Sequence, residues 1–144
     1  MRRVNIWAVL VSAVVFWLVG GLWYGLLFGQ RWLAVVGKTE AQLKAINPIP
    51  NYVLAFVLEI VIAGAIGWVT SHTGELNVKR GIRVALGMWL AFVATTFAIN
   101  YGFEGAPLAL YWITLGQYLV GMLLSGMIVG AWTSSAGNSR AARA

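Results

Sequence analysis

Four long apolar segments constrain the fold of this chain more than any other feature of its sequence. A membrane-spanning helix needs about 20 mostly apolar residues, and four segments meet that requirement. The strict apolar–polar alternation that is typical of membrane β-strands is absent. The sequence therefore predicts an all-α integral membrane protein, a bundle of four helices. The predicted spans cover approximately residues 5–28, 52–71, 82–101 and 108–133.

The amino-acid composition argues against a soluble fold. Of the 144 residues, 60% are hydrophobic and only 10% are charged, whereas soluble domains are about half apolar and about one quarter charged. A chain this short cannot bury such an excess within itself, but a lipid bilayer can accommodate it. We therefore expect one membrane domain over residues 1–133, followed by a disordered basic tail over residues 134–144.

The distribution of basic residues predicts how the helices are oriented. With four spans, both termini and the middle loop lie on one side of the membrane. That side carries seven of the ten Lys and Arg residues, which predicts cytoplasmic termini and a location in the cell membrane. Because the basic residues lie in short loops and at the chain ends, the net charge of +6 does not indicate nucleic-acid binding.

The segment between the first two predicted spans shows signs of a short amphipathic helix. Thr39 followed by Gln42 fits a capping box, so we expect a helix near residues 40–46. Pro48 and Pro50 then end this helix and lead into the second span. Trp32 is typical of a side chain anchored at the membrane surface.

The amino-terminal part of the chain carries a distinctive pattern of tryptophans, glycines and apolar residues. It is formed by residues 5–11, 20–25, Phe28, Gly29, Trp32 and Gly37. This pattern is similar to the opening of a four-span bacterial and fungal membrane family known as domain of unknown function 1761. The resemblance implies an integral membrane protein of about this length, and it implies no activity and no catalytic residue. Beyond this part of the chain, only the number and spacing of the spans agree.

Glu59 is the most informative single residue, because it lies inside the second apolar segment. At 1.5 Å per residue it is about 10 Å below the outer end of that segment. An ionised carboxylate is costly in hydrocarbon unless it is paired, protonated or facing a cavity. Ala63 and Gly67 follow at helical spacing, and such ridges of small residues pack against other helices. We therefore expect Glu59 to face the interior of the bundle.

Depth and helical facing predict a polar site around Glu59 in the outer half of the bundle. Tyr24, Thr96, Asn100 and Gln117 are expected to converge there from the other three spans. One interpretation is a site for a proton, a cation or a small polar or cationic ligand, in a small carrier or channel-like subunit. The alternative is a structural or regulatory membrane protein in which the glutamate only sets the packing.

Three small-residue motifs predict close contacts between helices. They can serve packing within the bundle, which we favour, or contact between copies in a homo-oligomer. The motifs pair Gly21 with Gly25, Ala63 with Gly67, and Gly126 with Gly130.

The sequence lacks the residues that most enzyme sites need. It contains no cysteine, no aspartate and a single histidine, His72. A catalytic triad, a thiol nucleophile and a multi-histidine metal site are therefore not expected. We expect no enzymatic activity, no cofactor and no metal site, with the lipid bilayer as the main partner.

Overall fold

The computed structural model describes residues 4–132, and this part of the chain is helical with no β-strand. Four helical stretches are long and apolar enough to cross a membrane. The predicted all-α membrane bundle is therefore confirmed. The tail expected over residues 134–144 lies outside the described residues. The four stretches are Ile6–Leu27, Ile49–His72, Val78–Glu104 and Leu108–Ala131.

Nine helical elements make up the described chain, and two of them, η1 and η2, are short π-helical segments within the first and third stretches. In order, they are α1 (Ile6–Leu22), η1 (Trp23–Leu27), α2 (Gly29–Val36), α3 (Glu40–Lys44), α4 (Ile49–His72), α5 (Val78–Met88), η2 (Trp89–Ala94), α6 (Thr95–Glu104) and α7 (Leu108–Ala131).

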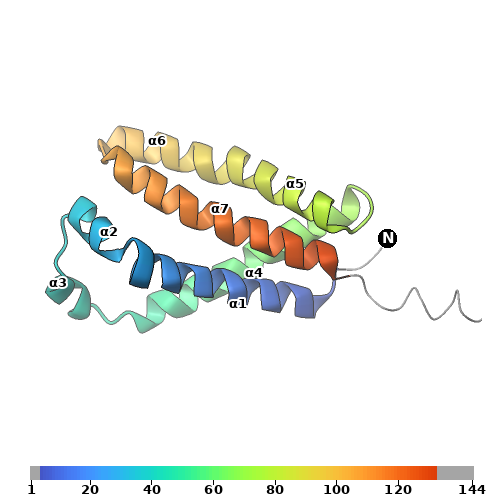
Figure 1. Cartoon of the computed structure of the whole chain (residues 1–144), viewed down its shortest axis with the longest axis horizontal. Helices are drawn as coiled ribbons and strands as arrows, with labels where there is room; N and C mark the ends of the chain where they lie inside the picture. The colour runs from blue at the N-terminus through green and yellow to red at the C-terminus, as the bar shows by residue number, and fades with distance from the viewer. Residues whose placement is uncertain (1–3, 133–144) are drawn as a thin grey trace, which may run out of the picture.

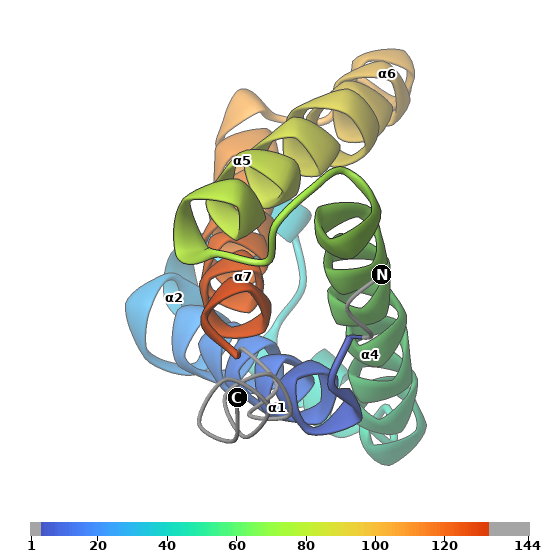
Figure 2. The ribbon, with the colours of Figure 1, turned by 90° about the vertical axis from the view of Figure 1, so that its right-hand side faces the viewer.

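Helix α7 forms the centre of the bundle. It packs against α5, α1 and α4, and Figure 2 shows it between α1 and α5 with α4 to one side. More than half of its most apolar stretch is buried, a larger share than in any other described span. The end of α4 that follows α3 is mostly exposed. The bundle therefore closes around α7 and leaves the first turns of α4 at its edge.

Glycines allow α5 and α7 to touch backbone to backbone. A β carbon at Gly126 would overlap the carbonyl group of Gly81, with the carbonyl carbon 2.8 Å away, and would lie 2.9 Å from the β carbon of Ala85. Gly130 lies in the same way against the backbone of Asn77. Only a residue without a side chain fits at these crossing points.

The remaining small-residue motifs divide between the interior and the surface. Ala63 and Gly67 lie in the buried face of α4, and Gly67 packs against Val129 of α7. Gly21 and Gly25 are exposed, and a β carbon at either would meet no atom of the described chain within 4 Å. The Gly21 motif therefore makes no close helix contact within the described bundle, contrary to the packing role that we favoured for it.

Helices α2 and α3 lie at the end of the bundle opposite the amino terminus (Figure 1). The expected capping box starts α3, because the Thr39 hydroxyl accepts from the Gln42 amide at 3.2 Å and the Gln42 side chain accepts from the Thr39 amide at 2.9 Å. Helix α2 was not predicted. The residue before its first turn, Phe28, carries no capping side chain, so the sequence lacks the usual signal for a helix start there. We call this end of the bundle the α3 end.

Candidate functional site

Glu59 is buried in the bundle without a partner. It is 8% exposed, and it forms no hydrogen bond or ion pair with any residue between 4 and 132. Its Oε2 atom is one of two enclosed side-chain oxygens in that range that lack a hydrogen-bond partner. The other is the hydroxyl of Ser12 on α1. Unsatisfied buried oxygens are rare in proteins because each costs free energy.

Ser12 and Glu59 lie at a similar depth in the bundle. Helices α1 and α4 pack side by side in opposite directions, and Val9 lies 3.9 Å from the position that a β carbon on Gly64 would take. From this contact, Ser12 is about 4.5 Å towards the α3 end along α1, and Glu59 is about 7.5 Å towards it along α4. The two unpartnered oxygens therefore lie at similar levels along the bundle. Ser12 shares its side of α1 with Phe16, which packs against Gly121 of α7.

Tyr118 of α7 is the titratable neighbour of Glu59 on another helix. The two groups are close enough for their charges to interact. The ring of Tyr118 meets Phe16 edge to face, with 5.9 Å between centroids, and packs against Phe97 at 5.6 Å. The phenol next to the carboxylate is thus itself held among aromatic rings.

Hydroxyl groups continue from Tyr118 towards the α3 end. The hydroxyls of Tyr101 and Thr114 are 3.4 Å apart, and Tyr24 lies close enough to Thr114, Tyr101 and Tyr118 for their polar groups to interact. We call Tyr24, Tyr101, Thr114 and Tyr118 the hydroxyl cluster. Of these four residues, only Tyr24 was predicted from the sequence as a member of the site.

Gln117 is buried, as expected for a member of the predicted site. Its amide nitrogen lies 3.4 Å from the position that a β carbon on Gly20 would take, so the side chain faces α1. It forms no hydrogen bond with another described residue. An amide in this position adds donor and acceptor capacity next to the hydroxyl cluster.

Thr96 and Asn100 do not join the site. Both are exposed on α6, whereas their direct successors Phe97 and Tyr101 contact α7 through Tyr118 and Thr114. The expected convergence of Thr96 and Asn100 on the site is therefore wrong in this structure. The inward face of α6 lies one residue later than predicted.

The π-helical segment η2 explains this displacement. Before it, the third stretch presents Gly81 and Ala85 to the core. An uninterrupted α-helix would continue that face through Thr96. A π-helical turn adds about one residue, which rotates every later side chain by about 100°. The inward positions after η2 accordingly become Phe97 and Tyr101.

Both π-helical segments begin at a tryptophan that is attached to α7. The indole nitrogen of Trp23 donates to the carbonyl oxygen of Ile113 at 2.9 Å, and that of Trp89 donates to Leu115 at 3.1 Å. These bonds join the first and third stretches to neighbouring turns of the central helix. They hold the walls of the site in place at the level of the hydroxyl cluster.

An apolar groove runs between α1 and α4 on the lipid-facing side. Its volume is about 410 Å³. The Trp17 indole donates to the carbonyl oxygen of Tyr52 at 3.3 Å, and the two rings meet edge to face. The groove is lined by Val14, Trp17, Leu18, Tyr52, Val53 and Phe56, and we call it the α1–α4 groove.

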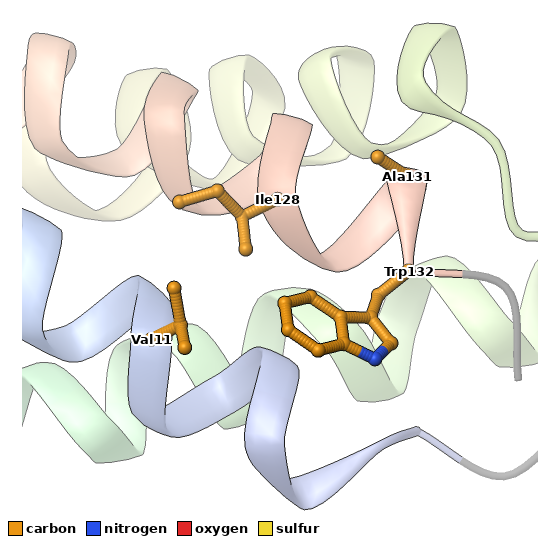
Figure 3. A pocket seen from close by; sticks show the side chains of 4 residues that line it. All are labelled: Val11, Ile128, Ala131 and Trp132. Atoms are coloured by element: carbon orange, nitrogen blue, oxygen red, sulfur yellow. The ribbon is translucent and has the colours of Figure 1, made fainter.

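A second groove lies between α1 and the carboxyl-terminal end of α7. Figure 3 shows Val11 facing Ile128 across it, with Ala131 and Trp132 closing the side nearer the termini. None of these four side chains is charged or titratable. This groove offers no group that would orient a polar ligand, so Glu59 and its neighbours remain the candidate site.

Comparison with known protein families shows to which family the chain is related. The sequence model of the family described as "Protein of unknown function (DUF1761)" matches residues 7–130. The chain belongs to this family. The DUF1761 match covers all four membrane stretches except the first residue of the first and the last residue of the fourth, which confirms and extends the resemblance of the amino-terminal part. The chain is thus a membrane protein of the DUF1761 family.

The DUF1761 description names no activity. No curated protein and no solved structure matches the chain. The function of this DUF1761 protein therefore has to be argued from its own residues, above all from Glu59.

Proposed function

We propose that this protein is a small carrier or channel-like subunit of the cell membrane in which Glu59 reversibly binds a proton or another cation. The observation that carries the proposal is the burial of an unpartnered carboxylate within a membrane-spanning helix. Ionisable groups at such positions are costly, and they commonly mark ion or substrate pathways.

The charge that neutralises Glu59 has to come from outside the described chain. Every Lys and Arg between residues 4 and 132 lies in α2, α3, a loop or the first two turns of α5. The single ion pair of that range joins Lys44 to Glu40. Within residues 4–132, a proton or a bound cation is therefore what remains to balance the carboxylate.

The hydroxyl cluster supports access from the α3 end. Its members lie between Tyr118, next to Glu59, and Tyr24, near the end of the first stretch. Hydroxyl groups both donate and accept hydrogen bonds, so they can pass a proton or solvate a small cation. The distribution of basic residues predicts that this end faces the outside and that both termini are cytoplasmic.

Flux measurements in liposomes test this proposal. The protein is reconstituted with a pH-sensitive dye inside, and a potassium diffusion potential is imposed with valinomycin. We expect proton entry with the wild type and none above empty liposomes with Glu59→Gln. Glu104→Gln, the same substitution at an exposed glutamate, is the matched control and should retain the flux. Equal flux in wild type and Glu59→Gln, with both folded by circular dichroism, would contradict the proposal.

A second candidate is a structural or regulatory protein that assembles through its helices. The observation in its favour is the exposed pair Gly21 and Gly25, which has no contact within the described chain. Such pairs allow two membrane helices to approach closely. Under this candidate, Gly21→Leu should shift the subunit number measured by single-molecule photobleaching in liposomes, and Glu59→Gln should lower stability without changing any flux.

A further inference from the structure

We propose that the α1–α4 groove binds a lipophilic organic cation, with Glu59 as the opposite charge. The class includes amines and onium ions that carry apolar or aromatic substituents. This inference rests on the proposed function, because it names the kind of cation that Glu59 would bind.

The α1–α4 groove has the size and lining of a small-molecule site. Its volume of about 410 Å³ is within the range of about 300–1,000 Å³ that is usual for such sites. Val14, Leu18 and Val53 on its rim are 45%, 50% and 58% exposed, so the groove opens sideways at the depth of the lipid chains. A ligand that enters from there has to be lipophilic.

Glu59 follows the groove on the same face of α4. Tyr52, Phe56 and Glu59 are spaced by four and then three residues, which places them on one side of an α-helix. Phe56 lines the groove, and Glu59 is one turn further on, where α4 enters the buried part of the bundle. The carboxylate therefore lies about one turn beyond the groove lining on the same side of α4, with no partner among the described residues.

The side chains of the α1–α4 groove and those near Glu59 favour an organic cation over a metal ion. Metal cations such as Ca²⁺ take about six to eight oxygen ligands. Besides the carboxylate itself, the polar group that is shown to lie near Glu59 among the described residues is the Tyr118 phenol. In contrast, the groove presents the aromatic rings of Trp17, Tyr52 and Phe56. Aromatic faces attract organic cations, and the attraction strengthens where water is excluded.

A proton and an organic cation would compete for the same carboxylate. Tyr118 of α7 is the titratable group that faces Glu59 from another helix. In the core of the bundle, α1 presents Ser12 and Phe16 and η2 presents Trp89, and none of these side chains titrates. Binding of one cation to the protonated site should therefore release one proton. This exchange is the basis of proton-coupled transport of a cation.

Binding of tetraphenylphosphonium to the protein in lipid discs tests the inference. Tetraphenylborate has the same shape and the opposite charge, so it reports apolar partitioning alone. Glu59→Gln removes the charge, and Val53→Trp fills the groove from its rim. Val61→Trp is the matched control, because Val61 is 61% exposed on the opposite side of α4 from Tyr52.

We expect saturable phosphonium binding that weakens about tenfold or more in both Glu59→Gln and Val53→Trp. Val61→Trp should bind as the wild type does, and tetraphenylborate should show no saturable binding. Equal phosphonium binding in wild type and Glu59→Gln, or in wild type and Val53→Trp, would overturn the inference and indicate partitioning into lipid.

Proton uptake in the same discs separates this inference from the proposed function. If Glu59 takes up a proton but phosphonium does not bind, the organic-cation inference fails and the proposed function stands. If neither proton uptake by Glu59 nor phosphonium binding is observed, the organic-cation inference and the proposed function both fail. If phosphonium binds and releases one proton per cation in the wild type only, both are supported.

Discussion

Replacing Gly126 with alanine should lower the free energy of unfolding by about 1–2 kcal/mol, whereas the same change at Gly21 should not lower it. Both glycines begin a Gly-x-x-x-Gly motif within a membrane helix. At Gly126 the new methyl group would overlap the carbonyl group of Gly81 and lie 2.9 Å from the β carbon of Ala85. At Gly21 it would meet no described atom within 4 Å.

The magnitude follows from how far α5 and α7 must separate. Ordinary contact begins near 3.4 Å, so the helices have to move apart by about 1 Å, and a gap of that size forfeits a quarter to a half of the local dispersion energy. Overpacking of this kind costs about 1–3 kcal/mol. Alanine returns up to about 1 kcal/mol through its higher helix propensity. At Gly21 only this gain applies.

The assay is equilibrium unfolding in mixed micelles with increasing dodecyl sulfate, followed by circular dichroism. The Gly126→Ala midpoint should fall to lower dodecyl sulfate, and the Gly21→Ala midpoint should stay or rise. If Gly126→Ala is as stable as Gly21→Ala, then α5 and α7 do not touch through Gly81 and Gly126, and the packing described for the centre of the bundle is wrong.

Three further substitutions test separate parts of the structure. Trp89→Phe removes the indole bond to Leu115 and should cost about 0.5–1.5 kcal/mol in the same micelle assay, and an unchanged midpoint would argue against that bond. Ser12→Ala removes a buried hydroxyl without a partner, so stability should stay equal or rise by about 1–2 kcal/mol, and a clear loss would mean that the hydroxyl has a partner. Thr39→Ala removes the cap shared with Gln42 and should cost α3 about 1 kcal/mol, visible as faster amide exchange in residues 40–44, whereas unchanged exchange would contradict the capping box.

The spans and the burial of Glu59 could be predicted because they depend on local physical rules. Apolar length identifies a membrane helix without any knowledge of its neighbours. Small residues at helical spacing from Glu59 indicated which side of α4 faces the bundle. The capping box at Thr39 likewise depends on residues only three apart, and the structure has it as expected.

The facing of α6 could not be predicted, because it depends on a backbone irregularity. The prediction assumed an uninterrupted α-helix throughout the third span. The π-helical segment η2 shifts the inward-facing positions after it by one residue. The signal was indirect: Phe97 and Tyr101 are the aromatic residues next to Thr96 and Asn100. No rule applied to the sequence alone would have chosen them over their polar neighbours.

The α1–α4 groove and the exposure of the Gly21 motif could not be predicted, because both depend on how whole helices are arranged in the bundle. The α1–α4 groove exists because the first turns of α4 lie at the edge of the bundle while α1 stays on α7. A glycine motif looks the same in sequence whether it faces a helix of its own chain or the lipid. Gly126 and Gly21 show both outcomes within one chain.

The most direct test of the account is to observe the protonation of Glu59 itself. Infrared difference spectroscopy of the protein in lipid discs, between about pH 5 and about pH 9, covers the range in which buried carboxyl groups often titrate. We expect a protonated carboxylic-acid band that disappears with rising pH in the wild type and in Glu104→Gln, and that is absent from Glu59→Gln. If no such band depends on Glu59, the carboxylate does not exchange a proton, and the proposed cation site would be contradicted.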